Sequence, residues 1–134
     1  FRSGELTEGS NWEAALTASH YKLDNLVAII DYNRLQITDL TSMVCNTDPL
    51  DDKFRAFGWY VEEIDGHDLD EMSRKFRQAP LMKNRPTCYI AHTVKGKGIS
   101  FMEHEKKWHH GVPDDGQYRQ AVSELDLQQK RLEA

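Results

Sequence analysis

The run Leu26–Tyr32 constrains the fold of this chain more than any other stretch. It reads Leu-Val-Ala-Ile-Ile-Asp-Tyr, and Asp31 is its only charged residue. A strand without polar alternation is typical of a parallel sheet that is covered on both faces. A segment with apolar residues at helical spacing precedes it, as expected for a helix packed on that sheet. The residues of the packed face would be Trp12, Ala15, Leu16, Ser19 and Leu23. The sequence therefore predicts an α/β fold, a partial parallel sheet with flanking helices.

Polar residues mark both ends of this helix–strand pair. Ser10 or Asn11 could cap the helix, and Glu13 is early enough to complement its N-terminal dipole. The strand ends in Asp31-Tyr32-Asn33, so polar groups emerge at its carboxyl end. In open α/β sheets ligands bind at that edge. We therefore expect a ligand site after Tyr32, at the carboxyl end of a central strand. Gly4 and Lys95–Gly98 should lie nearby, because both glycine-containing stretches follow strand-like segments.

Further helices and strands alternate along the rest of the chain. Gln36–Asp48 has no sustained period and predicts a long loop. Strands are expected at 59–64 and 86–94, with His92 inside the second as a core residue or a support for the site. Three further helices are expected. The first is opened by Pro49 and ended by Gly58, with Leu50, Phe54 and Phe57 buried. The second is Leu69–Ala79, capped by Asp68, and the last is capped by Asp114 or Asp115 and frays over 128–133.

Composition narrows the class of protein. A length of 134 residues predicts at most one domain, spanning 1–134, and no apolar run approaches the length of a membrane span. The net charge of −5 argues against general nucleic-acid binding, because no basic stripe is available for phosphates. The start carries no signal-peptide pattern, and Cys45 and Cys88 lie in unrelated contexts. We expect two reduced structural thiols in a cytoplasmic protein.

Two stretches after the strand expected at 86–94 could face a ligand. Lys95-Gly96-Lys97-Gly98 combines glycines, which let backbone approach a ligand, with two positive charges. Residues 103–111 carry His104, His109 and His110, but no cysteine or helical histidine pair completes a tetrahedral zinc set. A single imidazole placed over a substrate explains this loop better.

Taken together, these motifs resemble the thiamine diphosphate-binding N-terminal section of transketolases. The resemblance covers almost the whole chain. The matching motifs are Gly-Glu-Leu-Thr-Glu-Gly-Ser-Asn-Trp-Glu-Ala (4–14), Tyr-Lys-Leu-Asp-Asn-Leu (21–26), Ile-Asp-Gly-His-Asp (64–68), His-Thr-Val-Lys-Gly-Lys-Gly (92–98) and Trp-His-His-Gly (108–111). The resemblance implies transfer of a two-carbon ketol unit between sugar phosphates, as in the pentose phosphate pathway.

The resemblance also implies a cofactor site. In the family, Gly-Asp-Gly is followed about thirty residues later by Asn; the Asp, the Asn and a carbonyl two residues further hold a divalent metal on the diphosphate. Asn33 and the Leu35 carbonyl match the metal ligands, for Mg²⁺ or Ca²⁺, and Gly4 matches the final glycine. Arg2 and Ser3 stand where Gly and Asp belong. The cofactor-binding residues implied by the resemblance are Gly4, Glu5, Asn33, Leu35 and Lys95.

Catalytic residues and partners follow from the same resemblance. Glu8 matches an acidic position at the family's dimer interface, although it could simply precede a helix. Either His109 or His110 would face the substrate: Trp108-His109 and the spacing from Lys95 favour His109, whereas His110-Gly111-x-Pro113 favours His110. The group that activates the cofactor's ring belongs to another domain. The implied partner is a C-terminal transketolase subunit or domain, in a homodimer or heterotetramer.

Two other interpretations stay open. The chain could be a non-catalytic or truncated relative that has lost the metal site, which Arg2-Ser3 favours. It could also resemble a deoxyxylulose phosphate synthase, although Ser-Asn-Trp-Glu-Ala and Asp-Gly-His-Asp fit transketolase better. The abrupt opening Phe1-Arg2-Ser3-Gly4 is expected to be the end of a strand in a fragment that lacks the front of the domain. We expect such a chain to bind thiamine diphosphate weakly or not at all.

Overall fold

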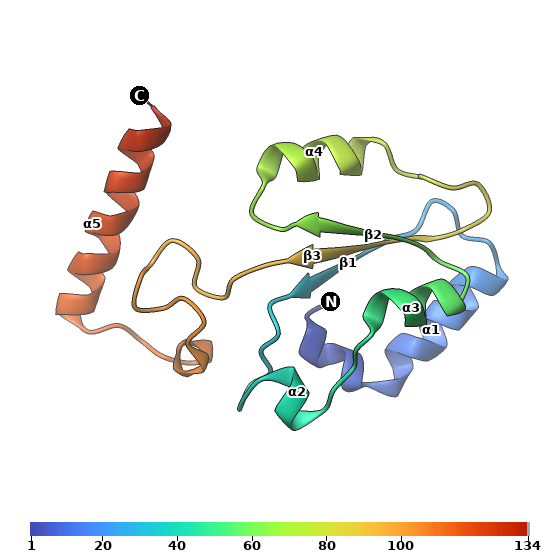
Figure 1. The fold of residues 1–134 in the computed structure, drawn as a ribbon, viewed down its shortest axis with the longest axis horizontal. Coiled ribbons are helices and arrows are strands. Elements are labelled where there is room, and N and C mark those ends of the chain that lie inside the picture. Colours follow the sequence, from blue (N-terminus) through green and yellow to red (C-terminus); the bar gives the residue numbers. More distant parts are fainter. Residues whose placement is uncertain (134) are drawn as a thin grey trace. The chain divides into compact units, whose positions relative to one another are not determined.

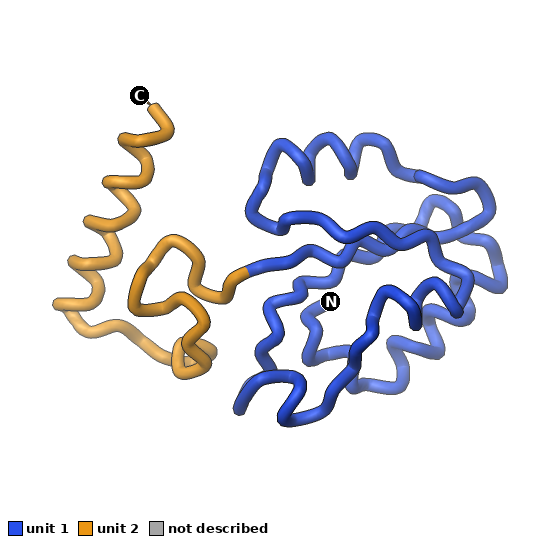
Figure 2. Tube along the Cα trace, viewed as in Figure 1, with its two compact units in different colours: residues 1–93 blue, residues 94–134 orange. Residues whose placement is uncertain are grey.

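The chain folds into two compact units. The structure, a computed structural model, describes residues 1–133. Its first unit is Phe1–Thr93 and its second is Val94–Ala134 (Figure 2). The first unit contains the sheet, and the second contains a glycine-bearing loop and one long helix.

A three-stranded parallel sheet forms the centre of the first unit. Its strands are β1 (Val27–Tyr32), β2 (Tyr60–Asp65) and β3 (Thr87–His92), in the order β1-β3-β2. The register places Tyr32 of β1 and Asp65 of β2 beside His92 of β3, so all three strands end together. The predicted α/β fold, a partial parallel sheet with flanking helices, is confirmed. The expected central position of the strand before Asn33 is wrong, because β3 lies in the middle.

Helices cover the two faces of this sheet. A 3₁₀ helix spans Ser3–Thr7, and the α-helices are α1 (Gly9–His20), α2 (Thr41–Val44), α3 (Leu50–Ala56) and α4 (Leu69–Arg77). In Figure 1, α1 and α3 lie on one face and α4 lies on the other. The region 36–48, predicted as a loop, contains the single turn of α2.

The buried core consists of two clusters separated by the sheet. Alternate residues of β3 belong to the two clusters. Cys88 and Ile90 point to the α1/α3 side, and Tyr89 and Ala91 point to the α4 side. Trp59 anchors the larger cluster, and its indole Nε1 donates to the Ala15 carbonyl of α1 at 2.9 Å. Because both faces of β3 are covered, this strand has the burial expected of a parallel strand.

The strand β1 is less covered than its apolar sequence predicts. Ile29 is 41% exposed, since α4 packs over β2 rather than over β1. On the outer edge of β1, the Asp31 amide donates to the Phe1 carbonyl at 2.7 Å, and Arg2 forms a parallel bridge with Asp31. The expectation that the opening residues are extended like the end of a strand is therefore confirmed.

The start of α1 differs from the prediction. The helix begins at Gly9 after Glu8, whose side chain makes no capping bond, so Ser10 and Asn11 lie in the first turn. Glu13 consequently lies beyond the first turn and does not complement the dipole there. The Asn11 amide instead donates to the Glu5 carbonyl of the preceding 3₁₀ helix at 2.7 Å. The Asn11 side chain thus joins α1 to the turn that precedes it, across six positions of sequence.

The packed face of α1 also differs. Ala15 and Ala18 are buried against the sheet, whereas Leu16 is 52% exposed and Leu23 lies beyond the helix end. Small side chains allow the helix to approach the sheet closely, and this decides which stripe is buried. The predicted contribution of Leu16 is wrong.

Other local signals are confirmed. Asp68 caps α4 by accepting from the Glu71 amide at 2.8 Å, and Pro49 precedes the first residue of α3. Gly58 follows α3 with φ +92°, a left-handed conformation that favours glycine. Phe57 is only partly buried, and α4 ends two residues before the predicted Ala79.

The second unit contains a 3₁₀ helix at Lys106–His109 and α5 at Asp115–Leu132. Asp114 caps α5: its carboxylate accepts from the Gln117 amide at 2.8 Å, and the Gln117 side chain bonds back to the Asp114 amide. Of the two predicted caps, Asp114 is the correct one. The helix continues to Leu132, so the expected fraying from Gln128 is not seen.

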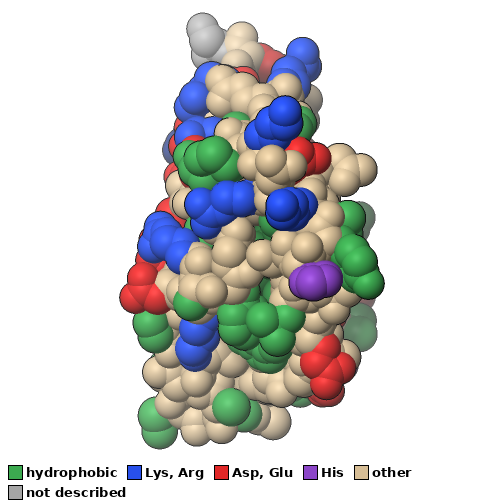
Figure 3. Space-filling view, turned by 90° about the vertical axis from the view of Figure 1, so that its right-hand side faces the viewer, with side chains coloured by type: hydrophobic (Ala, Val, Ile, Leu, Met, Phe, Trp, Pro, Cys, Tyr) green, Lys and Arg blue, Asp and Glu red, His purple; other side chains and the backbone are tan. Residues whose placement is uncertain are grey.

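The surface facing the viewer in Figure 3 carries hydrophobic side chains in small groups among charged ones. Leu23, Leu26 and Met82, each about two-fifths exposed, lie in the segments that lead into β1 and β3. Across residues 1–133, every helix is too short or too polar to cross a lipid bilayer.

Candidate functional site

A tight turn follows β1 at the predicted ligand edge. Asn33 Oδ1 accepts from the Leu35 amide at 2.9 Å, and Asn33 Nδ2 lies 3.2 and 3.3 Å from the two carboxylate oxygens of Asp31. Arg34 between them has φ +61°. The Asp31 carboxylate also accepts from the Thr93 hydroxyl, so it is held on both sides. Asp31 thus orients the Asn33 amide, a role that the sequence motif did not reveal.

Ser3 and Gly4 lie at the same end of the sheet as this turn. Arg2 pairs with Asp31, so the two residues that follow Arg2 continue past the bridge toward the turn. A Cβ atom on Gly4 would lie 3.0 Å from Gln36 Cγ, which shows that Gly4 packs directly on the turn. The predicted proximity of Gly4 to the Asn33 segment is confirmed. The predicted proximity of Lys95–Gly98 stays a prediction.

Two oxygens at this place are buried without partners. Ser3 is 1% exposed, and among residues 1–133 its Oγ makes no hydrogen bond; the same holds for Oε1 of Gln36. An unpartnered buried oxygen costs free energy, so two of them beside one motif indicate groups available to a ligand. Gln36 was not singled out from the sequence, because only the contact with Gly4 reveals it.

The donors at this site are of the right kind for Mg²⁺ but lack charge. Ser3 Oγ, Asn33 Oδ1 and the Leu35 carbonyl are oxygens, and Mg²⁺ is usually bound through one or two carboxylates with phosphate oxygens and water. Within the described part of the chain, no group of three His, Cys, Asp or Glu residues could hold a metal. The site therefore fits an oxygen-bound cation by donor type, with the Ser3 hydroxyl where the family resemblance implies a carboxylate.

The two glutamates assigned by resemblance have different surroundings. Glu5 Oε2 accepts from the Arg2 amide at 2.6 Å and so caps its own 3₁₀ helix. Glu8 is exposed at the start of α1, and its side chain makes no cap bond. An exposed carboxylate is compatible with an interface role. The assigned roles of both residues stay predictions.

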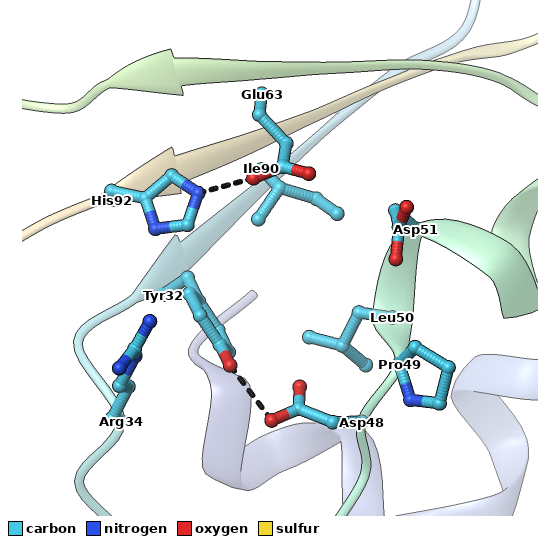
Figure 4. A pocket seen from close by; sticks show the side chains of 9 residues that line it. All are labelled: Tyr32, Arg34, Asp48, Pro49, Leu50, Asp51, Glu63, Ile90 and His92. Carbon is cyan, nitrogen blue, oxygen red and sulfur yellow. Dashed lines mark hydrogen bonds and ion pairs between the residues drawn. The ribbon is translucent and has the colours of Figure 1, made fainter.

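A pocket of about 230 Å³ opens beside the turn (Figure 4). His92 Nε2 lies 2.6 Å from Glu63 Oε2, and the Tyr32 hydroxyl donates to Asp48 at 2.8 Å. The Arg34 guanidinium lies 5.4 Å from the Tyr32 ring centre. Pro49, Leu50, Asp51 and Ile90 complete the lining.

Two features of this pocket are new with respect to the sequence. His92 is not a core residue: its side chain is 42% exposed, because β3 ends there and the ring reaches the pocket. Burial, together with the hydrogen bond and negative charge of Asp48, raises the pKa of Tyr32, so the phenol stays protonated at neutral pH. The pocket thus contains hydrogen-bonding groups of both charge signs.

The second unit brings two predicted residues together. Lys95 Nζ lies 3.4 Å from His109 Nδ1, although fourteen positions separate them. His110 stacks edge-on against His109, with ring centres 4.5 Å apart. Of the two candidate histidines, the Lys95 contact therefore involves His109.

The two cysteines lie in different surroundings. Cys88 is buried in β3, and burial raises the pKa of its thiol to about 12. Cys45 is exposed, and the structure has both as free thiols, as expected.

Comparison with known proteins gives consistent matches. The family model described as "Transketolase, thiamine diphosphate binding domain" matches residues 1–130. The chain is 48% identical over 130 residues to a subunit of the apulose-4-phosphate transketolase of Phocaeicola vulgatus, covering 97% of the chain and 46% of the relative. It is 47% identical over 106 residues to human transketolase, covering 79% of the chain and 16% of the relative.

Solved structures agree on the fold. The transketolase of Campylobacter jejuni superposes with a TM-score of 0.70 at 26% identity, covering 97% of this chain and 24% of that one. The chain thus spans about half the length of the split-type relatives and less of the single-chain ones. The structure has a parallel sheet, with Gly4 packed beside the turn at Asn33, and the family model matches residues 1–130. The chain therefore belongs to the transketolase family, within its thiamine diphosphate-binding domain.

Proposed function

We propose that this chain forms part of a transketolase that moves a two-carbon ketol unit between sugar phosphates. The observation that carries the proposal is the family match over residues 1–130, together with the arrangement of Ser3, Gly4, Asn33 and Leu35 at one sheet edge. Relatives that are themselves named as single subunits of a transketolase support a separate partner. In this proposal the partner is a C-terminal subunit, in a homodimer or heterotetramer in the cytoplasm.

Two sets of residues would serve the cofactor. Asn33 Oδ1, the Leu35 carbonyl and the Ser3 hydroxyl would hold Mg²⁺ or Ca²⁺, with Gly4 allowing close backbone approach. Lys95 would neutralise phosphate charge, and Glu5 would support the loop that it caps. When bound, thiamine diphosphate would supply the nucleophilic carbon that carries the ketol unit.

The remaining roles concern the substrate and the interface. His109, beside the Lys95 ammonium, is favoured over His110 as the imidazole that orients the sugar. Glu8 would lie at the interface between protomers, where its exposed carboxylate finds a partner.

A second candidate function, that of a non-catalytic relative, is supported by the residues at positions 2 and 3. Arg2-Ser3 removes the anionic metal ligand, which favours a chain that keeps the fold but binds the cofactor weakly. A hydroxyl replaces a carboxylate next to a divalent cation, so the attraction between two opposite charges is lost. We expect the chain as it stands to show no micromolar binding of thiamine diphosphate by calorimetry with Mg²⁺ present. Ser3→Asp alone should change this little, because other contacts come from the partner.

A chimera separates the two functions. Residues 1–133 replace the matching section of the Phocaeicola vulgatus relative, which is then combined with its own partner protein. The first function predicts a chimera that transfers ketol units with Arg2-Ser3 retained, whereas the second predicts an inactive chimera that gains activity in the Arg2→Gly/Ser3→Asp variant. In the active chimera, His109→Ala should lower turnover more than His110→Ala does.

Each result is decisive. An active chimera with Arg2-Ser3 retained would show that the metal-site argument is wrong. A folded, assembled but inactive double variant would refute the transketolase function. A larger effect of His110→Ala would reverse the choice of histidine.

A further inference from the structure

The loop that carries Lys95 is closed on itself. The His104 amide donates to the Lys95 carbonyl at 3.0 Å, and the Gly98 amide donates to Glu103 Oε1 at 3.0 Å. Gly96 has φ +77°, and a Cβ atom there would lie 2.4 Å from the Met102 carbonyl oxygen. The loop can therefore adopt this path only with glycine at that position.

Three side chains of α5 hold this loop from outside. Glu124 Oε2 accepts from the Ser100 amide at 2.6 Å, and Glu124 Oε1 accepts from the Ser100 hydroxyl at 2.7 Å. Gln128 Nε2 donates to the Gly98 carbonyl at 2.7 Å. Gln120 Nε2 donates to Glu124 Oε1 at 2.7 Å and thereby fixes the carboxylate. The bonds from Glu124 and Gln128 to the loop span 24 to 30 positions of sequence, so they are tertiary contacts.

The segment 98–101, which the α5 side chains contact, is connected to both Lys95 and His109. The Trp108 indole donates to the Phe101 carbonyl at 2.9 Å, and the two rings lie 5.3 Å apart. Trp108 precedes His109 in the same 3₁₀ helix. On the other side, the closed loop fixes the Lys95 backbone. A displacement of residues 98–101 would therefore reach Lys95 and His109.

We propose that Glu124 and Gln128 are positioning residues, which hold the 95–104 loop so that Lys95 and His109 stay paired. The inference rests on the proposed function, because that pair is the part of this unit assigned to ligand. It gives α5 a role other than core packing, because Ala121 alone is buried among the described residues of this helix.

The chemistry explains why a glutamate is needed. The Ser100 amide donates to one Glu124 oxygen and the Gln120 amide donates to the other, so a partner with two accepting oxygens satisfies both. A glutamine offers one accepting oxygen, and its amide nitrogen would face a donor. The Ser100 hydroxyl and amide and the Gln120 amide hold the pKa of Glu124 below its ordinary value, so the carboxylate is ionised at neutral pH. Hydrogen bonds to a charged acceptor are the stronger kind.

The test compares two variants on α5 with a control at Glu133, the C-terminal cap of that helix. Glu124→Gln and Gln128→Ala remove bonds to the loop, whereas Glu133→Gln alters the Gln129–Glu133 bond at 2.8 Å, away from it. Amide hydrogen exchange of the full chain is followed by NMR. We expect the Ser100 amide to exchange at least tenfold faster in Glu124→Gln and to be unchanged in Glu133→Gln, with the same helix content by circular dichroism.

A second readout separates positioning from mere stability of the unit. The imidazole NMR signals of His109 should shift in Glu124→Gln and Gln128→Ala, in the same direction as in Lys95→Ala, and should not shift in Glu133→Gln. Unchanged His109 signals, or unchanged exchange of Ser100, would overturn the inference. If Glu124→Gln loses helix content, Gln128→Ala alone decides, because it removes one hydrogen bond.

The outcome is independent of the test of the proposed function. If the Arg2→Gly/Ser3→Asp chimera is inactive, the proposed function fails while exchange and His109 signals still decide the role of α5. If the chimera is active, Glu124→Gln should weaken the apparent affinity for thiamine diphosphate at least fivefold, and Glu133→Gln should not. An equal affinity in both variants would refute the positioning role.

Discussion

Replacing Ser3 by alanine should make the protein more stable. The Ser3 side chain is 1% exposed, and its Oγ lacks a hydrogen-bond partner among the described residues. A buried polar group left unpaired costs about 1–3 kcal/mol. Alanine removes that oxygen and leaves a gap of one small atom, so part of the gain is lost to poorer packing. The expected net effect is about 1 kcal/mol of added stability, set by the lower part of the unpaired-group range.

Urea unfolding followed by tryptophan fluorescence measures this difference. The midpoint should rise while the slope with urea concentration stays the same, because the surface exposed on unfolding is unchanged. Thr87→Val is the matched control: Thr87 is fully buried in β3, its Oγ1 also lacks a partner in the described structure, and valine has the same shape. It should be stabilised by a similar amount, since the same kind of group is removed.

The result that would refute this reasoning is a destabilised Ser3→Ala. A loss of about 1 kcal/mol or more would mean that Ser3 Oγ is hydrogen-bonded in solution, for example by an ordered water. A stabilised Thr87→Val alongside it would restrict that conclusion to the candidate site around Ser3. Stabilisation of both variants would support the conclusion that the unpaired Ser3 hydroxyl lowers the free energy of unfolding.

Three further predictions test other parts of the chain. Gly96→Ala should disorder the 95–104 loop, because φ +77° and the Met102 carbonyl both oppose a Cβ; faster amide exchange there, without loss of sheet signals, is the check. Phe54→Ala should cost about 3–5 kcal/mol in urea unfolding, since Phe54 is 2% exposed between two tryptophan rings. Burial raises the pKa of Glu62, but its bonds to Lys75 and a tyrosine outweigh this and lower it overall. Stability from this group is therefore present above its unfolded pKa, near 4.5, and is lost as pH falls through the lower folded value; Lys75→Met should flatten that acid limb.

The sequence predicted those features of the fold that depend on neighbouring residues. The apolar run before Asn33, the glycine after α3 and the caps Asp68 and Asp114 are local signals, and the structure confirms them. Periodicity and capping are determined within a few residues, so no knowledge of distant contacts was needed. The family resemblance belongs to the same category, because its motifs are short and contiguous.

The errors arose where distant segments decide the outcome. Which stripe of α1 is buried depends on how closely its alanines approach the sheet, and the position of β1 at one side depends on strand pairing. His92 lines a pocket with Glu63, which is twenty-nine positions away in sequence and lies on the neighbouring strand β2. No local pattern contains such information.

The candidate site divides in the same way. The family resemblance implied Asn33, Leu35 and Gly4 as candidates, and residue types indicated Lys95 and the histidine-bearing loop. Only the tertiary structure paired Lys95 with His109, revealed the unpartnered oxygens of Ser3 and Gln36, and linked α5 to the glycine loop. The physical reason is that hydrogen bonds and burial depend on distances in space, which the chain establishes only when the sheet and loops have closed.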